Sequence, residues 1–477
     1  MTSHHGVGDL YQSALCAPGH QRQRGDRFGR MFGDLPALFT DPAVLIALGS
    51  ATGSAPMKAA ASAAKTKTVA VGQVFFGQFI DHDITLDVES SVTSVNDPGA
   101  IANSRTPTLD LDCVYGSGPE TQPYLYESGD VAVNPFAGAK LLIGGTGAWA
   151  GNDLQRNGDG VAMIGDFRND ENRIVSQIQL GMIKVHNKFA DELHAADPAL
   201  HGKELYEAAR KATTWHYQWA VVHDFLHNMC GPDVVKDILS NGRCYYLPAY
   251  DDPYMPVEFS VAAYRFGHSM APLKIQVQPG GAKHDLFGGA LGAFSAIASA
   301  DEVVEWPEVF KVSGNKWQRA ERCDPKMASV LLALPFIPPT EPPEVRSLAT
   351  RNLRRGQSFL LPSGEAVAAA MSDKLPKHIK ASDIKKVSDA AEAMHKSLTG
   401  GCTPLWLYCL LEGSVLGRGG KAGQKGEGLG PVGGRIVAEV LIGLLECDSR
   451  SWLGSDRSWT PESGRETIGD LLQWGAT

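Results

Sequence analysis

Polar side chains stand among aromatic ones between Phe75 and Asp83, in the order Phe-Phe-Gly-Gln-Phe-Ile-Asp-His-Asp. On a helix, Gln78, Asp81 and His82 share one face, while Asp83 points about 100° away from His82. Burying these groups beside phenylalanines is unfavourable without partners, so a solvated helix face is the weaker interpretation. A neutral histidine in apolar surroundings suits acid–base catalysis, because it can take a proton from hydrogen peroxide and return it to the leaving water.

A second group of oxygen-bearing residues follows in the loop from Thr106 to Asp112. Every second side chain of an extended loop points the same way. Asp110 and Asp112, with Thr106 and backbone carbonyls, would therefore form a hard oxygen site suited to Ca²⁺. Taken alone, the pattern fits a polar turn by default.

Arg168 lies in a third polar segment, just before a long helical pattern. An arginine is always charged and can polarise the O–O bond of a bound peroxide. The alternative is a charge cluster at a helix start, where Asp170 and Glu171 favour the positive N-terminal end. The residues alone favour that alternative.

A fourth segment, Tyr264–Ser269, holds His268 directly after a glycine. By default a lone histidine is a hydrogen-bonded core residue. An imidazole can also bind iron through one ring nitrogen while a partner on the other nitrogen sets its basicity.

Four motifs in this order resemble the animal heme peroxidases, the family of myeloperoxidase, lactoperoxidase, thyroid peroxidase and peroxidasin. The resemblance covers residues 28–453 approximately and implies a bound heme b. On the first motif it implies that Gln78 lines the distal cavity and His82 is the acid–base catalyst. It also implies that Asp81 is ester-linked to a heme methyl and that Asp83 binds calcium.

The other motifs receive roles by the same match. The run from Val114 to Ser117 resembles the sequel of the family's calcium loop, which implies a calcium site formed by Asp83, Thr106, the Thr108 carbonyl, Asp110 and Asp112. Arg168 is matched to the catalytic arginine and Glu171 to the second heme-ester residue. His268 is matched to the proximal iron ligand, Asn352 to its hydrogen-bond partner, and Arg265 to a residue near a heme propionate.

Two positions depart from the family pattern. Myeloperoxidase has a methionine after the second ester residue that forms a sulfonium link to heme, whereas this chain has Asn172, which puts chloride oxidation of that kind in question. Many members continue the Asn352 motif with Arg-Asp-His-Gly, whereas this chain has Gln357-Ser358-Phe359-Leu360, so the match at Asn352 is looser than at His82.

The resemblance implies a peroxidase that reduces hydrogen peroxide and oxidises halides, thiocyanate or phenols. One alternative is a fatty-acid heme dioxygenase. That branch carries a radical-forming tyrosine three residues before the proximal histidine, where this chain has Arg265, and it lacks the two ester carboxylates. A second alternative is a heme protein without catalysis, used for sensing or structure.

Apolar periodicity predicts that long helices position these residues. The ranges are 173–195, 204–229, 302–312, 325–335, 382–397, 404–413 and 432–446. Residues 89–110 and 417–434 read as irregular, and residues 51–70 as a loop or a short helix. We expect one mainly α domain over residues 1–477, with little β-sheet and a core from about 28 to 453.

Composition limits the remaining classes. The 477 residues carry a net charge of −9, which gives no reason to expect nucleic acid binding. No apolar run reaches the roughly 18 residues of a membrane helix, and residues 1–6 do not resemble a Sec signal. We expect a monomer that is cytoplasmic or exported by a non-Sec route. The eight cysteines are expected to be reduced and buried, which favours a bacterial member.

A histidine pair and a glycine-rich run do not predict a site. His223 and His227 have the spacing of a zinc motif, but Asp224 replaces the required glutamate and no third ligand is evident. The glycine-rich run Gly417–Gly423 suggests a phosphate loop, but no strand precedes it and no Gly-Lys-Ser/Thr follows. We expect a mobile loop there.

Overall fold

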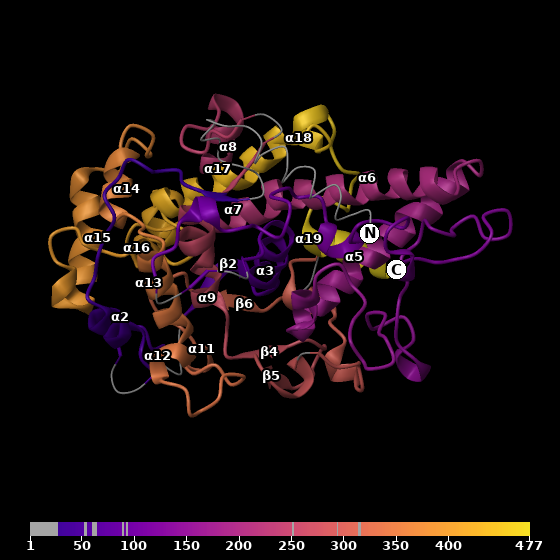
Figure 1. Cartoon of the computed structure of the whole chain (residues 1–477), viewed down its shortest axis with the longest axis horizontal. Coiled ribbons are helices and arrows are strands. Elements are labelled where there is room, and N and C mark those ends of the chain that lie inside the picture. Colours follow the sequence, from indigo (N-terminus) through magenta and orange to yellow (C-terminus); the bar gives the residue numbers. More distant parts are fainter. Residues whose placement is uncertain are drawn as a thin grey trace.

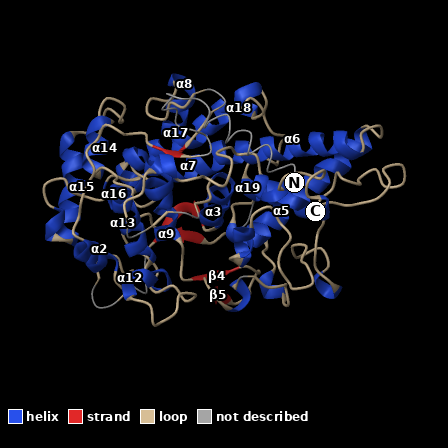
Figure 2. Cartoon of the chain, in the orientation of Figure 1, coloured by secondary structure: helices blue, strands red, loops and turns tan. Residues whose placement is uncertain are grey.

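The computed structural model describes residues 27–51, 55–59, 64–87, 90–91, 94–249, 252–292, 294–312 and 316–477. Helices make up most of the chain and the strands are short (Figures 1 and 2). Buried apolar side chains from Phe28 to Leu472 form one continuous core. The mainly α fold class is therefore confirmed. The single-domain assignment stays a prediction that this continuous core supports.

The α-helices are α2 (Pro42–Gly49), α3 (Gly72–Ile84), α4 (Asp112–Tyr115), α5 (Arg173–Ala196), α6 (Gly202–Ala220), α7 (Leu226–Met229), α8 (Pro232–Asn241), α9 (Gly267–Met270), α10 (Trp306–Val309), α11 (Ser329–Leu332), α12 (Pro343–Arg346), α13 (Leu348–Ser358), α14 (Gly364–Ala370), α15 (Ala381–Met394), α16 (Leu405–Val415), α17 (Pro431–Cys447), α18 (Trp452–Ser455) and α19 (Ile468–Ala476). The strands are β1 (Phe28–Gly29), β2 (Lys65–Ala70), β3 (Met255–Pro256), β4 (Lys274–Gln276), β5 (Lys283–Asp285) and β6 (Arg319–Glu321). They pair as β1 with β3, β2 with β6, and β4 with β5.

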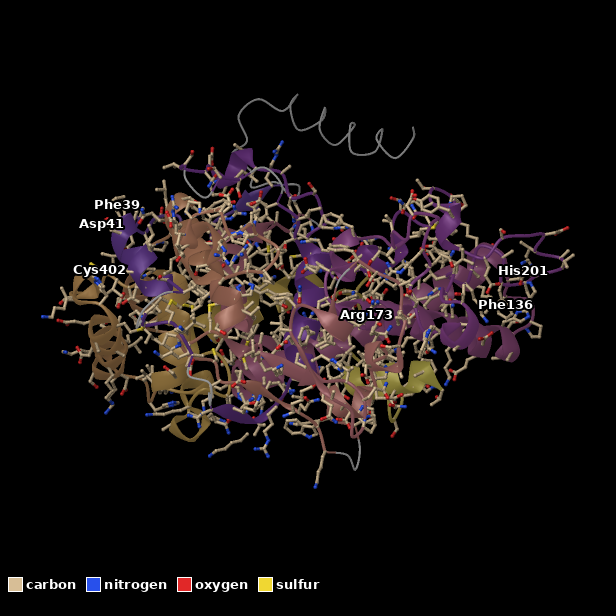
Figure 3. The ribbon with its side chains drawn as sticks, turned by 90° about the horizontal axis from the view of Figure 1, so that it is seen from below. Phe39, Asp41, Phe136, Arg173, His201 and Cys402 are labelled. Atoms are coloured by element: carbon tan, nitrogen blue, oxygen red, sulfur yellow. The ribbon has the colours of Figure 1, made fainter. Side chains whose placement is uncertain are left out.

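Helix α3 lies near the centre of the molecule, between a group around α14–α16 at one end and α5 and α6 at the other (Figure 1). The labelled residues show the same long axis: Phe39 and Cys402 lie at one end and Phe136 at the other (Figure 3). Helix α3 is mostly buried because its phenylalanines face the core. A Cβ atom on Gly77 would lie 2.9 Å from Phe225, so only glycine allows this close approach.

Helices α5 and α6 form the long pair that the apolar pattern predicted. The Asn172 side chain caps α5 by accepting a hydrogen bond from the Ile174 N–H at 3.0 Å. Helix α6 continues through a π-helical turn, Val221–Phe225, into α7, so the predicted segment 204–229 is helical throughout.

Asp224 links three distant elements. Its Oδ2 atom accepts hydrogen bonds from Gln73 Nε2 of α3 at 2.9 Å and from the Ile468 N–H at the start of α19 at 3.2 Å. Its Oδ1 atom accepts one from Asn228 Nδ2 at 2.8 Å. A buried carboxylate with three donors is well compensated, and it ties the central helix to the last helix of the chain.

Helix α17 is buried along almost its whole length and begins on a buried glutamate side chain. Glu412 of α16 accepts hydrogen bonds from the backbone N–H groups of Val432, at 3.1 and 3.0 Å, and Gly433, at 3.2 Å. These are two of the N–H groups that a helix leaves unpaired at its start. Burial raises the pKa of Glu412 to about 8.

Three predicted elements were wrong in extent or type. The helix expected at 302–312 is shorter and forms only α10. Pro307 disfavours a helical backbone in the residues before it but is tolerated in the first turn, so the helix can begin only at Trp306. The helix expected at 325–335 is only α11. Part of 51–70 forms β2, paired with β6, where a loop or short helix was expected; residues 52–54 and 60–63 lie outside the described residues.

The glycine-rich segment 417–434 was predicted to be irregular. It contains two turns of 3-10 helix, and α17 begins inside it at Pro431, so its last residues are helical instead. Its residues 426–430 are buried, and the Leu429 N–H donates to the Met229 carbonyl at 2.8 Å. The mobility expected for Gly417–Gly423 stays a prediction. Within the described residues no helix is long and apolar enough to cross a membrane.

We predict that Glu412→Gln makes the free energy of unfolding less dependent on pH. The folded pKa of about 8 lies above the unfolded value of about 4.3, so the folded state keeps a proton that the unfolded chain loses as pH rises. The stabilisation that Glu412 adds to the free energy of unfolding is therefore fully present below about pH 4.3. It declines toward pH 8, by up to about 1.4 kcal/mol per pH unit.

Urea unfolding from about pH 5 to 8 measures this difference. The stability gap between wild type and Glu412→Gln should narrow as pH rises. The exposed Glu392→Gln variant on α15 is the control and should show a constant gap. A constant gap for Glu412→Gln as well would contradict the prediction.

Candidate active site

His82 is buried on α3 and fixed through one ring nitrogen. Its Nδ1 atom lies 2.8 Å from Asn169 Oδ1, and Asn169 Nδ2 in turn donates to Gln179 Oε1 at 2.9 Å. Because Asn169 uses its nitrogen on Gln179, its oxygen faces His82 and assigns the proton to Nδ1. The Nε2 atom is then an unprotonated base. Burial, with the charge of Arg168, lowers the pKa of His82 to about 4, which keeps the ring neutral near pH 7.

Gln78, Asp81 and Glu171 lie around this histidine. Glu171 Oε1 is 3.7 Å from His82 Nε2 and accepts a hydrogen bond from Gln78 Nε2. Burial raises the pKa of Glu171, and the nearby Arg168 opposes that rise. Gln78 and His82 therefore approach the same carboxylate, as residues on one face of a helix can.

The Arg168 side chain is held rigidly beside the end of α3. Its Nε and Nη2 atoms donate to Asp166, at 3.1 and 2.7 Å, and Nη2 also donates to the backbone carbonyls of His82 at 3.0 Å and Thr85 at 2.7 Å. Its Nη1 atom donates to no side chain or carbonyl of the described residues. Arg168 thus presents a fixed positive charge next to His82 with one nitrogen still available.

His268 of α9 is also held at Nδ1 by an amide, but by the nitrogen of that amide. Its Nδ1 atom lies 2.9 Å from Asn352 Nδ2, and Asn352 is a buried residue of α13. Arg265 Nη1 donates to Asn352 Oδ1 at 3.4 Å, and Arg265 Nε donates to the Ser260 carbonyl at 2.9 Å. Because Nδ1 accepts from Asn352, the proton of the neutral ring lies on Nε2 in this structure. Burial and the charges of Arg265 and Arg351 lower the pKa of His268 to about 3.

The side chains matched to heme contacts share an unusual exposure. Gln78, Asp81, Glu171, Arg265 and His268 are all partly exposed, whereas their neighbours in sequence Phe79, Ile80 and Phe266 are at most 2% exposed. These polar groups of α3, α9 and the segments beside them are therefore accessible, whereas the apolar side chains next to them are packed in the core. The charge of Asp81 acts to raise the pKa of both His82 and Arg265, so Asp81 lies near both the His82 side and the His268 side of the site. Such an arrangement fits a large planar cofactor.

Three carboxylates converge on the far side of α3. Asp83, Asp110 and Asp112 each offer an oxygen within 4.8 Å of the others, and no other such group of His, Cys, Asp or Glu occurs in the part of the chain that the structure describes. Asp83 is fully buried, and its Oδ1 atom has no hydrogen-bond partner there. Burial, then Asp112 and Asp110, raise the pKa of Asp83, and burial raises that of Asp112 to about 7.

The loop around these carboxylates has further features of an oxygen site. Thr106 Oγ1 lies 3.4 Å from Asp112 Oδ2, and Thr108 Oγ1 is buried without a partner. Leu111, between the two aspartates, has φ of 60°, a left-handed conformation that is strained for leucine. The structure therefore gathers Asp83 and the predicted loop in one place.

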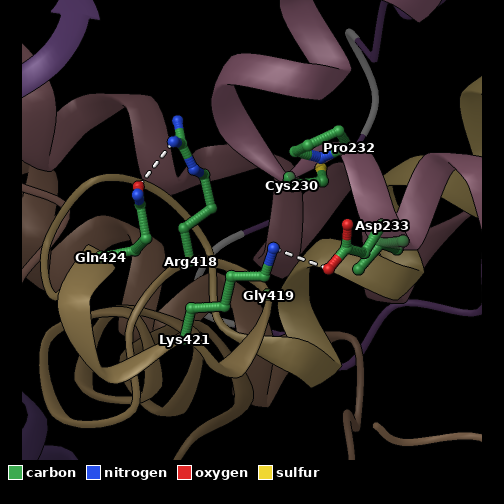
Figure 4. A pocket seen from close by; sticks show the side chains of 9 residues that line it. Cys230, Pro232, Asp233, Arg418, Gly419, Lys421 and Gln424 are labelled. Atoms are coloured by element: carbon green, nitrogen blue, oxygen red, sulfur yellow. Dashed lines mark hydrogen bonds and ion pairs between the residues drawn. The ribbon is translucent and has the colours of Figure 1, made fainter.

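The glycine-rich loop and the His223–His227 pair lie away from His82 and His268. A pocket of about 110 Å³ is lined by the glycine-rich loop and the start of α8, but its Lys421 pairs with Asp233 at 2.6 Å and its Arg418 with Gln424 at 2.6 Å (Figure 4). The rings of His223 and His227 meet edge to face, His223 also lies against Trp219, and no third metal ligand joins the two histidines in the described residues.

Sequence reasoning missed Asn169 and Asp166. Asn169 orients His82. Asp166 accepts hydrogen bonds from Arg168 and forms an ion pair with Arg105 at 2.8 Å. Both lie in the Arg168 motif itself, so their position was a usable signal. Their partners across the fold were not readable from the sequence.

Comparison with known families gives one match over residues 90–390, to the profile described as "Animal haem peroxidase". This segment is more than half of the chain and includes Arg168, Glu171, His268 and Asn352. The chain belongs to the animal haem peroxidase family. The matched segment begins after His82, so the assignment of the distal helix rests on the geometry above.

The curated relatives are distant and much longer. Dual oxidase 1 of Caenorhabditis elegans is 26% identical over 247 residues, which cover 48% of this chain and 16% of that protein. Thyroid peroxidase of Mus musculus is 26% identical over 185 residues, which cover 37% of this chain and 20% of the relative. The chain thus spans at most a fifth of the length of these relatives.

Solved structures share the fold. Peroxidase A from Dictyostelium discoideum superimposes with a TM-score of 0.63 at 14% identity, over 95% of this chain and 94% of its own. A fatty acid alpha-dioxygenase of Oryza sativa superimposes with a TM-score of 0.60 at 15% identity, over 95% of this chain and 80% of its own. At these identities the likeness concerns the fold alone.

Proposed function

We propose that this chain is a heme peroxidase that reduces hydrogen peroxide and oxidises small donors. The observation that carries the proposal is a pair of imidazoles, His82 and His268, each held at Nδ1 by a side-chain amide. Neither Nε2 atom forms a hydrogen bond with the described residues, and the helices that carry them, α3 and α9, pack together. For His268 to bind iron, its proton would move to Nδ1 and the Asn352 amide would turn its oxygen toward that atom. One imidazole is positioned as a base and the other as an iron ligand.

A heme b group fits these residues. His268 would bind the iron through Nε2, and the pairing of its Nδ1 with Asn352 would keep the ring oriented. Asp81 and Glu171 would form the two esters to heme methyls, and Arg265 would pair with a propionate. When bound, heme supplies the iron redox chemistry through which peroxide accepts two electrons.

The protein residues then manage protons and charge. His82 Nε2 takes a proton from the incoming peroxide and returns it to the departing oxygen as water forms. Arg168, held by Asp166 and by two carbonyls at the end of α3, stabilises the negative charge that develops as the O–O bond breaks. Gln78, bonded to Glu171, lines the same side. Halides, thiocyanate or phenols then donate the electrons.

We also infer that Asp83, Asp110 and Asp112 bind Ca²⁺ together with Thr106 and the Thr108 carbonyl. Three carboxylates this close repel one another, and a divalent cation removes that repulsion. It would also give the unpaired Oδ1 atom of Asp83 a partner. Because Asp83 follows His82, the ion would hold the distal helix to the loop.

Fatty-acid dioxygenation is the second candidate, favoured by the shared fold with the plant enzymes. The arrangement around Tyr264 weighs against it. Tyr264 Oη donates to the Gly77 carbonyl at 3.1 Å, and its ring stacks on Phe259 with centroids 4.5 Å apart. This phenol is one position away from the radical-forming site, where Arg265 stands.

That the protein is a monomer, is bacterial and binds neither nucleic acid nor a membrane stays a prediction.

The absorption spectrum and acid–organic extraction test the cofactor. After turnover with peroxide, heme should remain with the wild-type protein and carry two ester links by mass analysis. Asp81→Asn/Glu171→Gln should release unmodified heme. Free heme from wild type would contradict the esters, and a protein without heme would overturn the proposed function. Oxygen uptake with linoleate and no peroxide-dependent dye oxidation would favour the dioxygenase.

Asn169→Leu should slow the reaction with hydrogen peroxide by about 100-fold, because His82 loses the bond that fixes its tautomer. Stopped-flow absorption of the heme measures the rate. In a His82→Gln background the same change should have little further effect, since the acid–base group is already gone. The exposed Asn241→Leu variant is the control. Equal losses in both backgrounds would show that Asn169 acts only on stability.

Removing calcium should lower the melting temperature of the wild type. Ligand binding stabilises by about 2.7 kcal/mol when free calcium is about 100 times Kd. Asp83→Asn/Asp112→Asn should melt at the same temperature with calcium or with a chelator. Asp97→Asn, an exposed change in the preceding segment, should keep the calcium response. A wild type indifferent to calcium would contradict the inferred site.

A further inference from the structure

Five of the nine tryptophans lie in one array of aromatic rings along α6, with rings from α5, α18 and α19. Consecutive rings have centroids 4.0 to 6.0 Å apart. Helices α18 and α19 each pack against α6 (Figure 1). The array consists of Trp474, Phe189, His216, Trp459, Trp215, Trp219, Trp452, His223 and His227.

The array reaches the surface at several points. Trp219 and Trp459 are partly exposed and lie 6.0 Å apart between ring centroids. Trp219 is also 4.0 Å from His223 and 5.1 Å from Trp452. Trp219 is therefore a junction between solvent and the buried rings.

A second face of α6 reaches the distal helix. Tyr217 is fully buried, and its ring meets those of Phe76 and Phe79 of α3 at 6.0 and 6.1 Å. His216 and Tyr217 are consecutive residues, so their side chains point about 100° apart on the helix. The array and the rings beside His82 are therefore joined at adjacent positions of α6, a separation over which electrons tunnel.

Packing alone does not explain the composition of this array. Trp452 Nε1 and His216 Nε2 are buried and form no hydrogen bond within the described residues. Leaving such a group unpaired is unfavourable by about 1–3 kcal/mol, which aliphatic side chains would avoid. Indole rings are, however, among the side chains most readily oxidised by one electron.

We propose that this array carries one-electron oxidising equivalents from the heme site to Trp219 and Trp459. There it oxidises phenolic donors that are too large to reach the heme. This inference rests on the proposed peroxidase function and adds a second, surface site for the donor.

Electrons and protons balance over one peroxide. Each of two phenols gives one electron to an oxidised indole at the surface and one proton to solvent, becoming a phenoxyl radical. The indole is restored to its reduced form, having earlier passed its own electron inward. Two such transfers and two protons from solvent complete the reduction of hydrogen peroxide to two water molecules.

A phenol coupled to a polyethylene glycol chain, compared with the free phenol, separates the two routes. Trp219→Phe/Trp459→Phe should lower peroxide-dependent oxidation of the tethered phenol by about tenfold and leave the free phenol unchanged, a loss of about 1.4 kcal/mol in transition-state stabilisation. Trp317→Phe is the matched control, because Trp317 is also partly exposed and has a lysine, Lys311, over its ring. The melting temperature verifies that the variants are folded.

Peptide mass analysis gives a readout independent of turnover. After peroxide without donor, oxygen should be added to peptides holding Trp219 and Trp459 and not to the peptide holding Trp317. Equal modification of all three, or unchanged oxidation of the tethered phenol in the double variant, would overturn the inference while leaving the peroxidase intact. No oxidation of the free phenol by wild type would instead overturn the proposed function.

Discussion

Helix α3 must present polar side chains in several directions while it packs among aromatic rings, and much of the site follows from this constraint. Every polar group on it needs a partner from another element. Asn169 holds His82, Glu171 accepts from Gln78, and Asp224 accepts from Gln73. On the far side, Tyr217 and the Leu111 N–H both donate to Asp83 at 3.1 and 3.3 Å. The partners come from segments more than 25 residues away, so the helix is usable only in the complete fold.

Away from the site, buried acidic side chains likewise provide hydrogen-bond acceptors for groups on other elements. Glu412 accepts from the start of α17, and Glu439 accepts from the backbone N–H groups of Cys244, Tyr245 and Tyr246. Mainly helical folds with irregular connections leave many N–H groups unpaired, and a carboxylate can satisfy several at once. These residues shape the core around α3 without taking part in its chemistry.

The sequence allowed the long helices and the main site residues to be predicted. Apolar steps of three and four residues located α5 and α17 almost to the residue, because one-sided burial dominates long helices. The predicted helix 204–229 covers α6, the π-helical turn and α7 together. Short helices were misjudged at 302–312 and 325–335, where proline and local packing set the limits. Asn169 was missed because its role comes from a hydrogen bond to His82, which lies 87 residues earlier. Asp166 was missed because its partner Arg105 lies outside the Arg168 motif. Asn352 was matched to His268 from a motif that departs from the family pattern, and the fold brings the two side chains within 2.9 Å.

The bridge through Asp224 has a consequence for how the protein is made. Gln73, next to the distal motif, shares one carboxylate oxygen with the first N–H group of the last helix, Ile468. A ribosome delivers the N-terminal part first, so α3 emerges nearly four hundred residues before this partner does. The contact with Ile468 can form only once that residue has left the ribosome. Any prosthetic group that depends on the settled position of α3 is therefore held in its final place only after residue 468 has been made.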